Sequence, residues 1–495
     1  MTRIVVVSLW AAALHAQTVQ GVAVNSATHK PVAGATVQLI GPADEDEHEI
    51  YRTSTDAAGR FHFERVAPGR YHAIAEAQGF TRMLAARAPS VGVEAVGAPE
   101  VSIPMVPASV ISGRISDQDG DALRYVSVEA LHYVYRGGKK VLDSAVSART
   151  NDRGEYRIFG LPPGRYYVRS TSRARGTTAF SPQFFPGARD ISQATQLEAA
   201  PGAELRSIDI VMRPDSLHSI SGRVVDAQTG QAVPEMYVIA RLNGDSYANG
   251  AAQMTDSFTI ADLLPGKYVV SSQQFGGNAP KAGRVAIDLG NADLTGIVLP
   301  LSAGLEITGT VRGLPAGSKE LRLFLQPENP AYDNYSENII EKGTFTFHNV
   351  RPDIYHLLWN VPKGVYVQSI KMGDRTLPSD RVDLNGTIAP LAIQLANDGA
   401  RVQGTVRNVA GEPVPGAVVS MAADPSYDVW SATCDDTGHF DIRDIAPGEY
   451  KLLAFQDAPQ GAPQDPDFRK PFEKSAIKLQ VLPSTQQKLD LVAVQ

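Results

Sequence analysis

The sequence has a single cysteine, Cys434, among 495 residues. One thiol cannot form an intramolecular disulfide, so every folded part of this chain must be stable through core packing alone. We interpret this scarcity, in a chain expected to be exported, as a sign of a bacterial protein. Cys434 precedes a turn that starts at Asp435, and His439 lies on the strand expected after that turn. We therefore expect a half-buried, unreactive thiol and not a catalytic nucleophile.

Sequence patterns of catalytic and metal-binding sites are also missing. None of the ten histidines belongs to a His-x-x-Glu or His-Glu-x-x-His pair, and neither a Gly-x-Ser-x-Gly elbow nor a glycine-rich phosphate loop occurs. The acidic run at residues 44–49 could attract Ca²⁺, but it lacks the glycine and the ligand spacing of a calcium loop. A solvated hairpin tip is the favoured interpretation. We predict no catalytic residue, no metal, no cofactor and no enzyme.

The charge balance restricts the kinds of partner that this chain can bind. The chain has 46 Lys and Arg against 53 Asp and Glu, a net charge of −7, and no basic stripe interleaved with aromatics. We therefore expect no nucleic-acid partner.

One apolar run, residues 4–14, follows Arg3 and ends shortly before Gln17. It is too short to span a bilayer. We interpret residues 1–16 as a secretory signal peptide, with a buried first strand as the alternative. The expected protein is exported, whether periplasmic, secreted or on the cell surface, and its mature chain has no transmembrane span.

A repeated motif is the main feature that is present. The pattern aromatic-x-apolar-x-x-apolar-x-Pro-x-x-Tyr occurs five times, roughly 90 to 100 residues apart, which is the length of a small β-sandwich. The copies lie at residues 61–71, 156–166, 258–268, 345–355 and 440–450. A second landmark is a glycine on a β-branched strand about 45 residues before each motif proline. These glycines are Gly21, Gly113, Gly222, Gly309 and Gly404.

Turn residues and alternating strands fill each repeat. Asp56, Asn151 and Asp435 each start a turn that leads into the aromatic strand, because an Asp or Asn side chain can bond the backbone of such a turn. In the Pro-Gly-x-Tyr turn we expect glycine to take the left-handed conformation, and the tyrosine hydroxyl to bond nearby backbone. The third and fourth copies diverge, since Ser257 lacks the turn glycine before it and Asp353 replaces the glycine after the proline.

Each repeat is expected to end in a closing strand. The expected closers are residues 101–105, 207–211, 295–299, 391–395 and 489–493. Each repeat then has about seven strands, the number in an immunoglobulin-like sandwich. No segment shows sustained helical periodicity. We predict an all-β chain of five tandem immunoglobulin-like or prealbumin-like β-sandwich modules after the signal peptide. The predicted modules are residues 17–108, 109–214, 215–302, 303–398 and 399–495.

The repeat resembles a known family. Residues 220–226, 402–407 and 435–440, the last leading to 446–450, resemble bacterial carboxypeptidase regulatory-like domains. The resemblance covers residues 19–495 as five copies, and it implies a transthyretin-like sandwich related to starch-binding-like and Cna-B-like folds. It implies an accessory domain from which no catalytic residues carry over. The lysine of isopeptide-forming Cna-B domains is absent, so no autocatalytic cross-link is expected; Arg114, Arg223, Thr310 and Thr405 follow the strand glycines instead.

Two classes of function fit this sequence. The first is a non-catalytic binding protein of the cell envelope whose loops present aromatic rings to a polysaccharide. The candidate ligand-binding residues are Phe180, Phe184, Phe185, Tyr332, Tyr335, Tyr427 and Trp430. Phe184 and Phe185 could instead tuck their loop onto the sandwich, Trp430 could belong to a core, and Trp359 with Trp430 forms no evident sugar-binding pair. The second class is a structural spacer or scaffold for a cell-envelope protein partner, with short connections that limit hinge motion.

Overall fold

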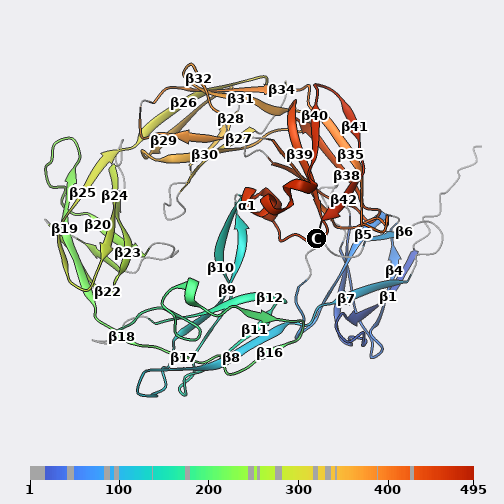
Figure 1. Ribbon diagram of the computed structural model, residues 1–495, viewed down its shortest axis with the longest axis horizontal. Helices are drawn as coiled ribbons and strands as arrows, with labels where there is room; N and C mark the ends of the chain where they lie inside the picture. The colour runs from blue at the N-terminus through green and yellow to red at the C-terminus, as the bar shows by residue number, and fades with distance from the viewer. Residues whose placement is uncertain are drawn as a thin grey trace, which may run out of the picture. The chain divides into compact units, whose positions relative to one another are not determined.

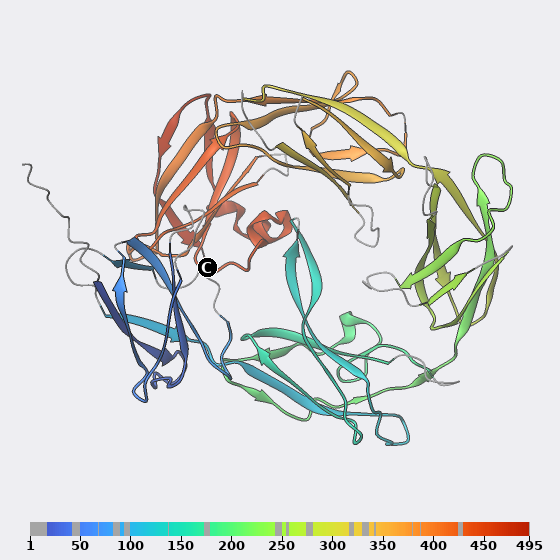
Figure 2. The same ribbon diagram turned by 180° about the vertical axis from the view of Figure 1, so that it is seen from behind.

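The computed structural model describes residues 17–41, 50–67, 69–82, 90–93, 100–136, 138–172, 179–242, 250–253, 257–273, 281–315, 321–328, 336–340, 343–378, 380–386, 388–423 and 429–494. Strands and turns make up nearly all of them (Figures 1 and 2). This confirms the all-β, sandwich-type fold. We call the segments around the five motif copies repeats one to five.

The chain divides into two compact units. The first comprises Met1–Tyr133, Leu142–Ser172 and Pro182–Arg213, and the second comprises Val134–Val141, Arg173–Ser181 and Pro214–Gln495. The first unit therefore holds repeat one and most of repeat two, and the second holds repeats three, four and five.

Repeat one has two facing sheets, with orders β4-β1-β7 and β3-β2-β5-β6. Its strands are β1 (Gln17–Asn25), β2 (Thr36–Ile40), β3 (Ile50–Ser54), β4 (Arg60–Val66), β5 (Gly69–Glu76), β6 (Ser90–Val93) and β7 (Val101–Met105). β1 runs antiparallel to β4 and parallel to β7. Apolar residues at every second position of β4 and β7 are buried, and they form one core with Tyr71.

Repeat two has the sheets β10-β9-β12-β14, with β15 also on β12, and β11-β8-β16, with β17 also on β8. Its elements are β8 (Ser109–Ser116), β9 (Ser127–Arg136), β10 (Lys139–Arg149), β11 (Glu155–Leu161), β12 (Gly164–Thr171), β13 (Ala179–Phe180), β14 (Gln183–Phe184), η2 (Ile191–Gln193), β15 (Leu197–Ala199), β16 (Glu204–Leu205) and β17 (Ile210–Val211). β13 pairs with β18 (Pro214–Asp215).

Repeat three is one rolled sheet of order β21-β20-β23-β24-β25-β19-β22. Its strands are β19 (His218–Asp226), β20 (Tyr237–Leu242), β21 (Gly250–Gln253), β22 (Phe258–Leu263), β23 (Gly266–Gln273), β24 (Lys281–Leu289) and β25 (Leu294–Ala303).

Repeat four has the sheets β29-β26-β34-β31-β32 and β28-β27-β30-β33. Its strands are β26 (Leu305–Arg312), β27 (Leu321–Pro327), β28 (Ser336–Ile340), β29 (Thr344–Val350), β30 (Ile354–Asn360), β31 (Tyr366–Met372), β32 (Arg375–Thr376), β33 (Arg381–Asp383) and β34 (Leu391–Ala396).

Repeat five has the strand order β37-β36-β39-β42-β35-β38, with β40 on β39 and β41 on β35. Its elements are β35 (Ala400–Arg407), β36 (Val418–Ala423), β37 (Val429–Thr433), β38 (His439–Ile445), β39 (Gly448–Phe455), η3 (Ala462–Gln464), α1 (Pro466–Arg469), η4 (Lys470–Ser475), β40 (Ile477–Val481), β41 (Gln486–Lys488) and β42 (Leu491–Val494). The short helical segment was not expected from the sequence. Its Phe468 and Phe472 rings pack on Phe455 of β39 and cover the outer face of that strand.

The motif strand contains a β-bulge in all five repeats. The bulge is the extra residue between the second and third apolar positions of the motif, and the pairing with the first strand shifts there. Each bulge has a residue with positive φ just before the third apolar position. These residues are Arg65 (φ 61°), Gly160 (77°), Asp262 (59°), Asn349 (56°) and Asp444 (58°).

The bulge corrects one sequence prediction. The glycine of the Pro-Gly-x-Tyr turn was expected to adopt the left-handed conformation, but Gly164, Gly266 and Gly448 do not have positive φ. The left-handed residue lies in the bulge, four residues before these glycines. A side chain is therefore permitted at the glycine position, and Asp353 occupies it in repeat four.

The motif tyrosine bonds nearby backbone, as predicted. In each repeat its ring is buried and its hydroxyl donates a hydrogen bond to the carbonyl oxygen four residues earlier. The pairs are Tyr71 with Ala67 (3.1 Å), Tyr166 with Pro162 (2.7 Å), Tyr268 with Leu264 (2.8 Å), Tyr355 with Arg351 (3.0 Å) and Tyr450 with Ala446 (2.6 Å). The hydroxyl group is thereby satisfied at the edge of the core.

The strand glycines mark a close approach of backbones. A Cβ built on each glycine would lie within 2.7 Å of a carbonyl oxygen on the closing segment, where real Cβ atoms do not occur. The distances are 2.1 Å for Gly21 to Val101, 2.2 Å for Gly113 to Ile208, 2.0 Å for Gly222 to Ile297, 2.7 Å for Gly309 to Leu391 and 1.6 Å for Gly404 to Leu489.

Two of the expected closing strands are shorter than predicted. The second covers only Ile210–Val211, and the last begins at Leu491. Beside each, an aspartate carboxylate replaces part of the backbone ladder. Asp209 accepts a bond from the Arg114 N–H (2.7 Å), and Asp490 accepts one from the Thr405 N–H (3.1 Å).

The predicted aspartate and asparagine turns are confirmed. Asp56, Asn151 and Asp435 each accept bonds from the N–H groups two and four residues later. The residue before each turn is buried. In repeat one, Thr55 Oγ1 donates to the Val32 carbonyl (2.7 Å) and accepts from the Ala35 N–H (2.8 Å).

Cys434 takes the place of this threonine in repeat five. Thr150 makes the same two bonds in repeat two, to Leu123 (2.6 Å) and Val126 (2.9 Å). Cys434 is buried, and burial together with Asp435 raises the pKa of its thiol to about 12, which disfavours the nucleophilic thiolate. A thiol is a weak hydrogen-bonding group, so this site has less polar stabilisation than its counterparts.

We expect Cys434→Thr to stabilise repeat five by about 1 kcal/mol, the usual net value of a hydrogen bond. The new hydroxyl would reach the Val414 carbonyl and the Ala417 N–H, which correspond to Val32 and Ala35. Hydrogen exchange followed by mass spectrometry should show slower exchange in β36 and β38 peptides. Thr55→Cys is the matched reverse change and should accelerate exchange in repeat one. Unchanged exchange in both variants would contradict the prediction.

Candidate functional site

Trp430, the first sequence candidate, packs against a core. It lies on β37, half-buried, and its ring contacts Tyr450 edge-on with a centroid distance of 5.5 Å. Tyr450 is the motif tyrosine of repeat five. The indole therefore contributes to the core of this repeat, which is the alternative that the sequence left open.

The three phenylalanines of repeat two are half-buried. Phe180 pairs with Pro214 across β13 and β18, and Phe184 pairs with Arg169 across β14 and β12. The Phe185 N–H donates to the Val168 carbonyl at 2.8 Å. The loop is thus attached to the edge of the β12 sheet.

The remaining candidates lie outside the described residues. They are Tyr332, Tyr335 and Tyr427, and the same holds for the acidic run at 44–49 and for the signal segment at 1–16. A sugar site at these tyrosines stays a prediction.

Polar contacts also lie at three of the joints between consecutive repeats. In the first unit, residues 106–108 connect repeats one and two. The Val106 carbonyl accepts from the Thr81 N–H (2.8 Å), and the Ala108 N–H donates to the Gly79 carbonyl (2.8 Å). On the other side, the Pro107 carbonyl accepts from the Gly202 N–H of repeat two (3.0 Å). Both neighbours hold the linker, which restricts its backbone.

In the second unit, Gly304 alone separates β25 from β26, between repeats three and four. A Cβ there would lie 2.2 Å from Asn349 Cα, so this linker residue packs directly against repeat four. Across this joint Arg284 of β24 forms a hydrogen-bonded ion pair with Asp353. The side chains are only 16% and 17% exposed. A buried ion pair constrains geometry strongly, because neither charge is stable without the other.

Residues 397–399 join repeats four and five. The Tyr366 hydroxyl of repeat four donates to Asp398 Oδ1 (2.8 Å), and the Asp398 carbonyl accepts from the Ser484 N–H of repeat five (2.7 Å). Burial and the Asp398 carboxylate raise the pKa of Tyr366 to about 12. In addition, the Gly364 N–H donates to Asp444 Oδ2 (3.0 Å). Asp398 thus bonds both repeats through different atoms.

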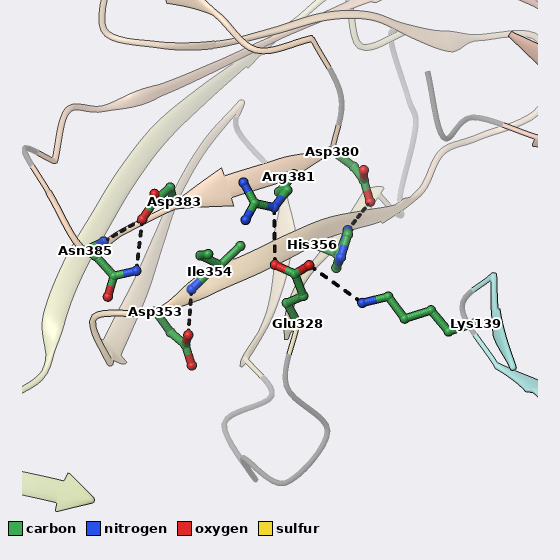
Figure 3. Close-up of polar contacts among 9 residues, drawn as sticks. All are labelled: Lys139, Glu328, Asp353, Ile354, His356, Asp380, Arg381, Asp383 and Asn385. Carbon is green, nitrogen blue, oxygen red and sulfur yellow. Dashed lines mark hydrogen bonds and ion pairs between the residues drawn. The ribbon is translucent and has the colours of Figure 1, made fainter. Parts of the chain in front are cut away.

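A polar cluster beside Asp353 lies on the β27–β30–β33 sheet of repeat four (Figure 3). His356 Nδ1 lies 2.9 Å from Asp380 Oδ2, and Arg381 Nε donates to Glu328 Oε2 at 3.2 Å. Glu328 also lies 3.7 Å from Lys139 Nζ of the same unit. Glu328 contacts both Arg381 and Lys139, and His356 contacts Asp380, so these contacts hold the side chains around β33 in place.

Catalytic or metal chemistry has no support in these contacts. Across the ranges that the structure describes, no group of three or more His, Cys, Asp and Glu side chains could hold a metal ion. His356 and Asp380 form a pair, but the contacts around them do not include a hydroxyl or thiol nucleophile among the described residues. Also within that part of the chain, no helix is long and apolar enough to cross a membrane.

One of the residues that make contacts at the joints stands out in the sequence. Asp353 is the departure from glycine in the fourth motif copy, and the structure shows that its carboxylate pairs with Arg284 of the preceding repeat. Arg284 and Asp398 have no such signal, because neither occupies a position of the repeated motif.

The comparisons with known proteins agree with the repeat pattern. The model of the carboxypeptidase regulatory-like domain matches residues 18–105, 110–211 and 401–469, which together exceed half of the chain. The chain belongs to the carboxypeptidase regulatory-like domain family. The matched segments correspond to repeats one and two and to most of repeat five. The two divergent motif copies, in repeats three and four, lie outside them.

Solved structures that match parts of this chain include two bacterial pilins and the Bacillus anthracis TIE protein. A streptococcal ancillary pilin is 13% identical over 58% of this chain and 99% of its own, with a TM-score of 0.24. The Bacillus anthracis TIE protein is 10% identical over 94% and 69%, with a TM-score of 0.16. The minor pilin GBS52 of Streptococcus agalactiae is 15% identical over 40% and 95%, with a TM-score of 0.23. These values are too low to transfer any property to the regulatory-like domains of this chain. No curated protein matches the chain.

Proposed function

We propose that this chain is a non-catalytic, exported scaffold of the cell envelope. Its five repeats would fold as separate β-sandwich domains, with the boundaries predicted from the sequence, and would hold a partner protein at a set spacing. Four buried clusters support the separate domains, because each stays within one repeat. They lie in repeats one, three, four and five.

The observation that carries this proposal is the bonding of the joints. In the joints at residues 106–108, 304 and 397–399, the linker or its flanking side chains bond to both adjacent repeats. A flexible tether of glycine and serine would leave these backbone groups to solvent. Joints that are held on both sides suit a protein whose task is to keep its repeats at fixed angles.

The joint between repeats four and five offers a direct test. Spin labels at Asp374→Cys and Val409→Cys, both exposed, would report the distance between these repeats in the Cys434→Thr background. We expect a narrow distance distribution, because Asp398 holds both sides. Asp398→Ala should broaden it, because the substitution removes the carboxylate that accepts the hydrogen bond from Tyr366.

A matched control is Asp383→Ala, which removes a carboxylate whose hydrogen bonds, among the described residues, are to Asn385 within repeat four. It should leave the distribution narrow. A broad distribution in the parent protein would mean a flexible joint, and it would contradict the scaffold proposal.

A further inference from the structure

The outer face of the β9–β12 pair in repeat two carries two tyrosines that no earlier prediction singled out. Along β9, Val128 and Ala130 are buried in the core, while Glu129, Leu131 and Tyr133 lie on the other face, where Leu131 is buried opposite Tyr167 of β12. Tyr133 is 37% exposed. Its ring lies 6.0 Å from that of Tyr167 on β12, and the ring planes are at 86°. The two rings therefore form a right-angled corner.

Fixed polar groups lie on the same face. Arg169 donates from Nε (3.0 Å) and Nη2 (2.7 Å) to Glu129 Oε2, and Gln196 Nε2 donates to the Tyr167 hydroxyl at 3.3 Å. The Arg169 and Glu129 side chains are 26% and 21% exposed, so they are held in place but accessible at the surface. Because Arg169 and Glu129 are paired, these two residues together add no net charge to the face.

We propose that this face binds a neutral oligosaccharide. A pyranose ring has an apolar C–H face, which packs on aromatic rings, and an edge of hydroxyl groups that both donate and accept hydrogen bonds. The corner formed by the two tyrosine rings can pack on the apolar face of the sugar. The Glu129 carboxylate, the Arg169 guanidinium and the Gln196 carboxamide can bond its hydroxyl groups. The charge balance favours a neutral sugar over a charged polymer, which would need an uncompensated opposite charge.

In repeat five, the corresponding face of the sheet is covered by another part of the chain. Lys451 and Leu453 there follow the motif tyrosine as Tyr167 and Arg169 do in repeat two. The chain itself covers that face, since Phe468 and Phe472 pack beside Leu453 and Phe455. The tyrosine pair and the Glu129–Arg169 pair distinguish repeat two.

Titration calorimetry on the protein from Gln17 to Gln495 tests the proposal, with cellohexaose, maltohexaose and chitohexaose as neutral probes and an oligogalacturonate as a charged one. We expect binding of at least one neutral probe. Tyr133→Ala and Tyr167→Ala should each weaken it about tenfold or more, because each removes an aromatic contact. Tyr167→Phe keeps the ring and should weaken it less.

The control is Tyr237→Ala, which removes a strand tyrosine of repeat three that is 49% exposed. It should leave the affinity unchanged, and circular dichroism should show that every variant remains folded. Failure of all three neutral probes to bind would overturn the proposal. So would binding confined to the oligogalacturonate, or equal affinity in the parent and in the two alanine variants. The joint measurements are independent, so this site can fail while the scaffold proposal stands.

Discussion

Gly404→Ala is expected to unfold or severely destabilise repeat five, by about 3 kcal/mol or more. The new Cβ would lie 1.6 Å from the Leu489 carbonyl oxygen, and the contact is with backbone, so a rotamer change cannot relieve it. The closing segment would have to move away from β35, and its bonds to that strand would be lost. Hydrogen exchange should show loss of protection in β35, β41 and β42.

Gly448→Ala serves as its matched control in the same repeat. A Cβ on Gly448 would meet the Tyr450 ring at 3.5 Å, an ordinary van der Waals contact, and the backbone there is not left-handed. We expect a change of roughly 0.5 kcal/mol or less for such a tolerated position. If Gly404→Ala were as mild as this control, the close approach of the two strands would be wrong.

Arg284→Met is expected to weaken the joint between repeats three and four by about 3 kcal/mol. The substitution keeps most of the apolar stem but removes the positive charge beside the largely buried Asp353 carboxylate. An uncompensated buried charge costs more than the pair contributes. Urea unfolding should therefore show repeats three and four unfolding at lower denaturant than in the parent protein.

The double variant Arg284→Met with Asp353→Gly separates the loss of the ion pair from the cost of an uncompensated Asp353 charge. It removes both charges and restores the glycine found after the proline in the other four motif copies. Much of the lost stability should return, because no buried carboxylate remains. Arg351→Met is the control, since its bond to Gln273 Oε1 is long, at 3.3 Å, and exposed. Equal effects of Arg284→Met and Arg351→Met would contradict the role assigned to the ion pair.

Local interactions were predictable from the sequence. The tyrosine hydroxyl bonds a carbonyl four residues earlier, and the Asp56 turn closes within four residues, so both follow from residue type and spacing. The helical segment was missed because it is short and has no amphipathic period, although Asp465 caps α1 and Pro466 occupies its first turn.

Contacts over long sequence separations were not predictable. The strand glycines were recognised as landmarks, but their cause is a carbonyl on a segment that follows much later in the repeat. The Arg284–Asp353 pair joins residues of two repeats, and its position depends on how β24 and β30 are placed by their own sheets. The tyrosine corner has the same origin, because Tyr133 and Tyr167 meet only when β9 pairs with β12.

The first and last strands of every repeat run side by side in the same direction: β1 with β7, β8 with β17, β19 with β25, β26 with β34 and β35 with β42. The chain therefore enters a repeat at one end of this pair and leaves it at the opposite end. Tension applied along the polypeptide would load the hydrogen bonds of the pair in shear, all together, instead of opening them one by one. Each repeat would then resist extension as a mechanical clamp, and the polypeptide would transmit force from one repeat to the next.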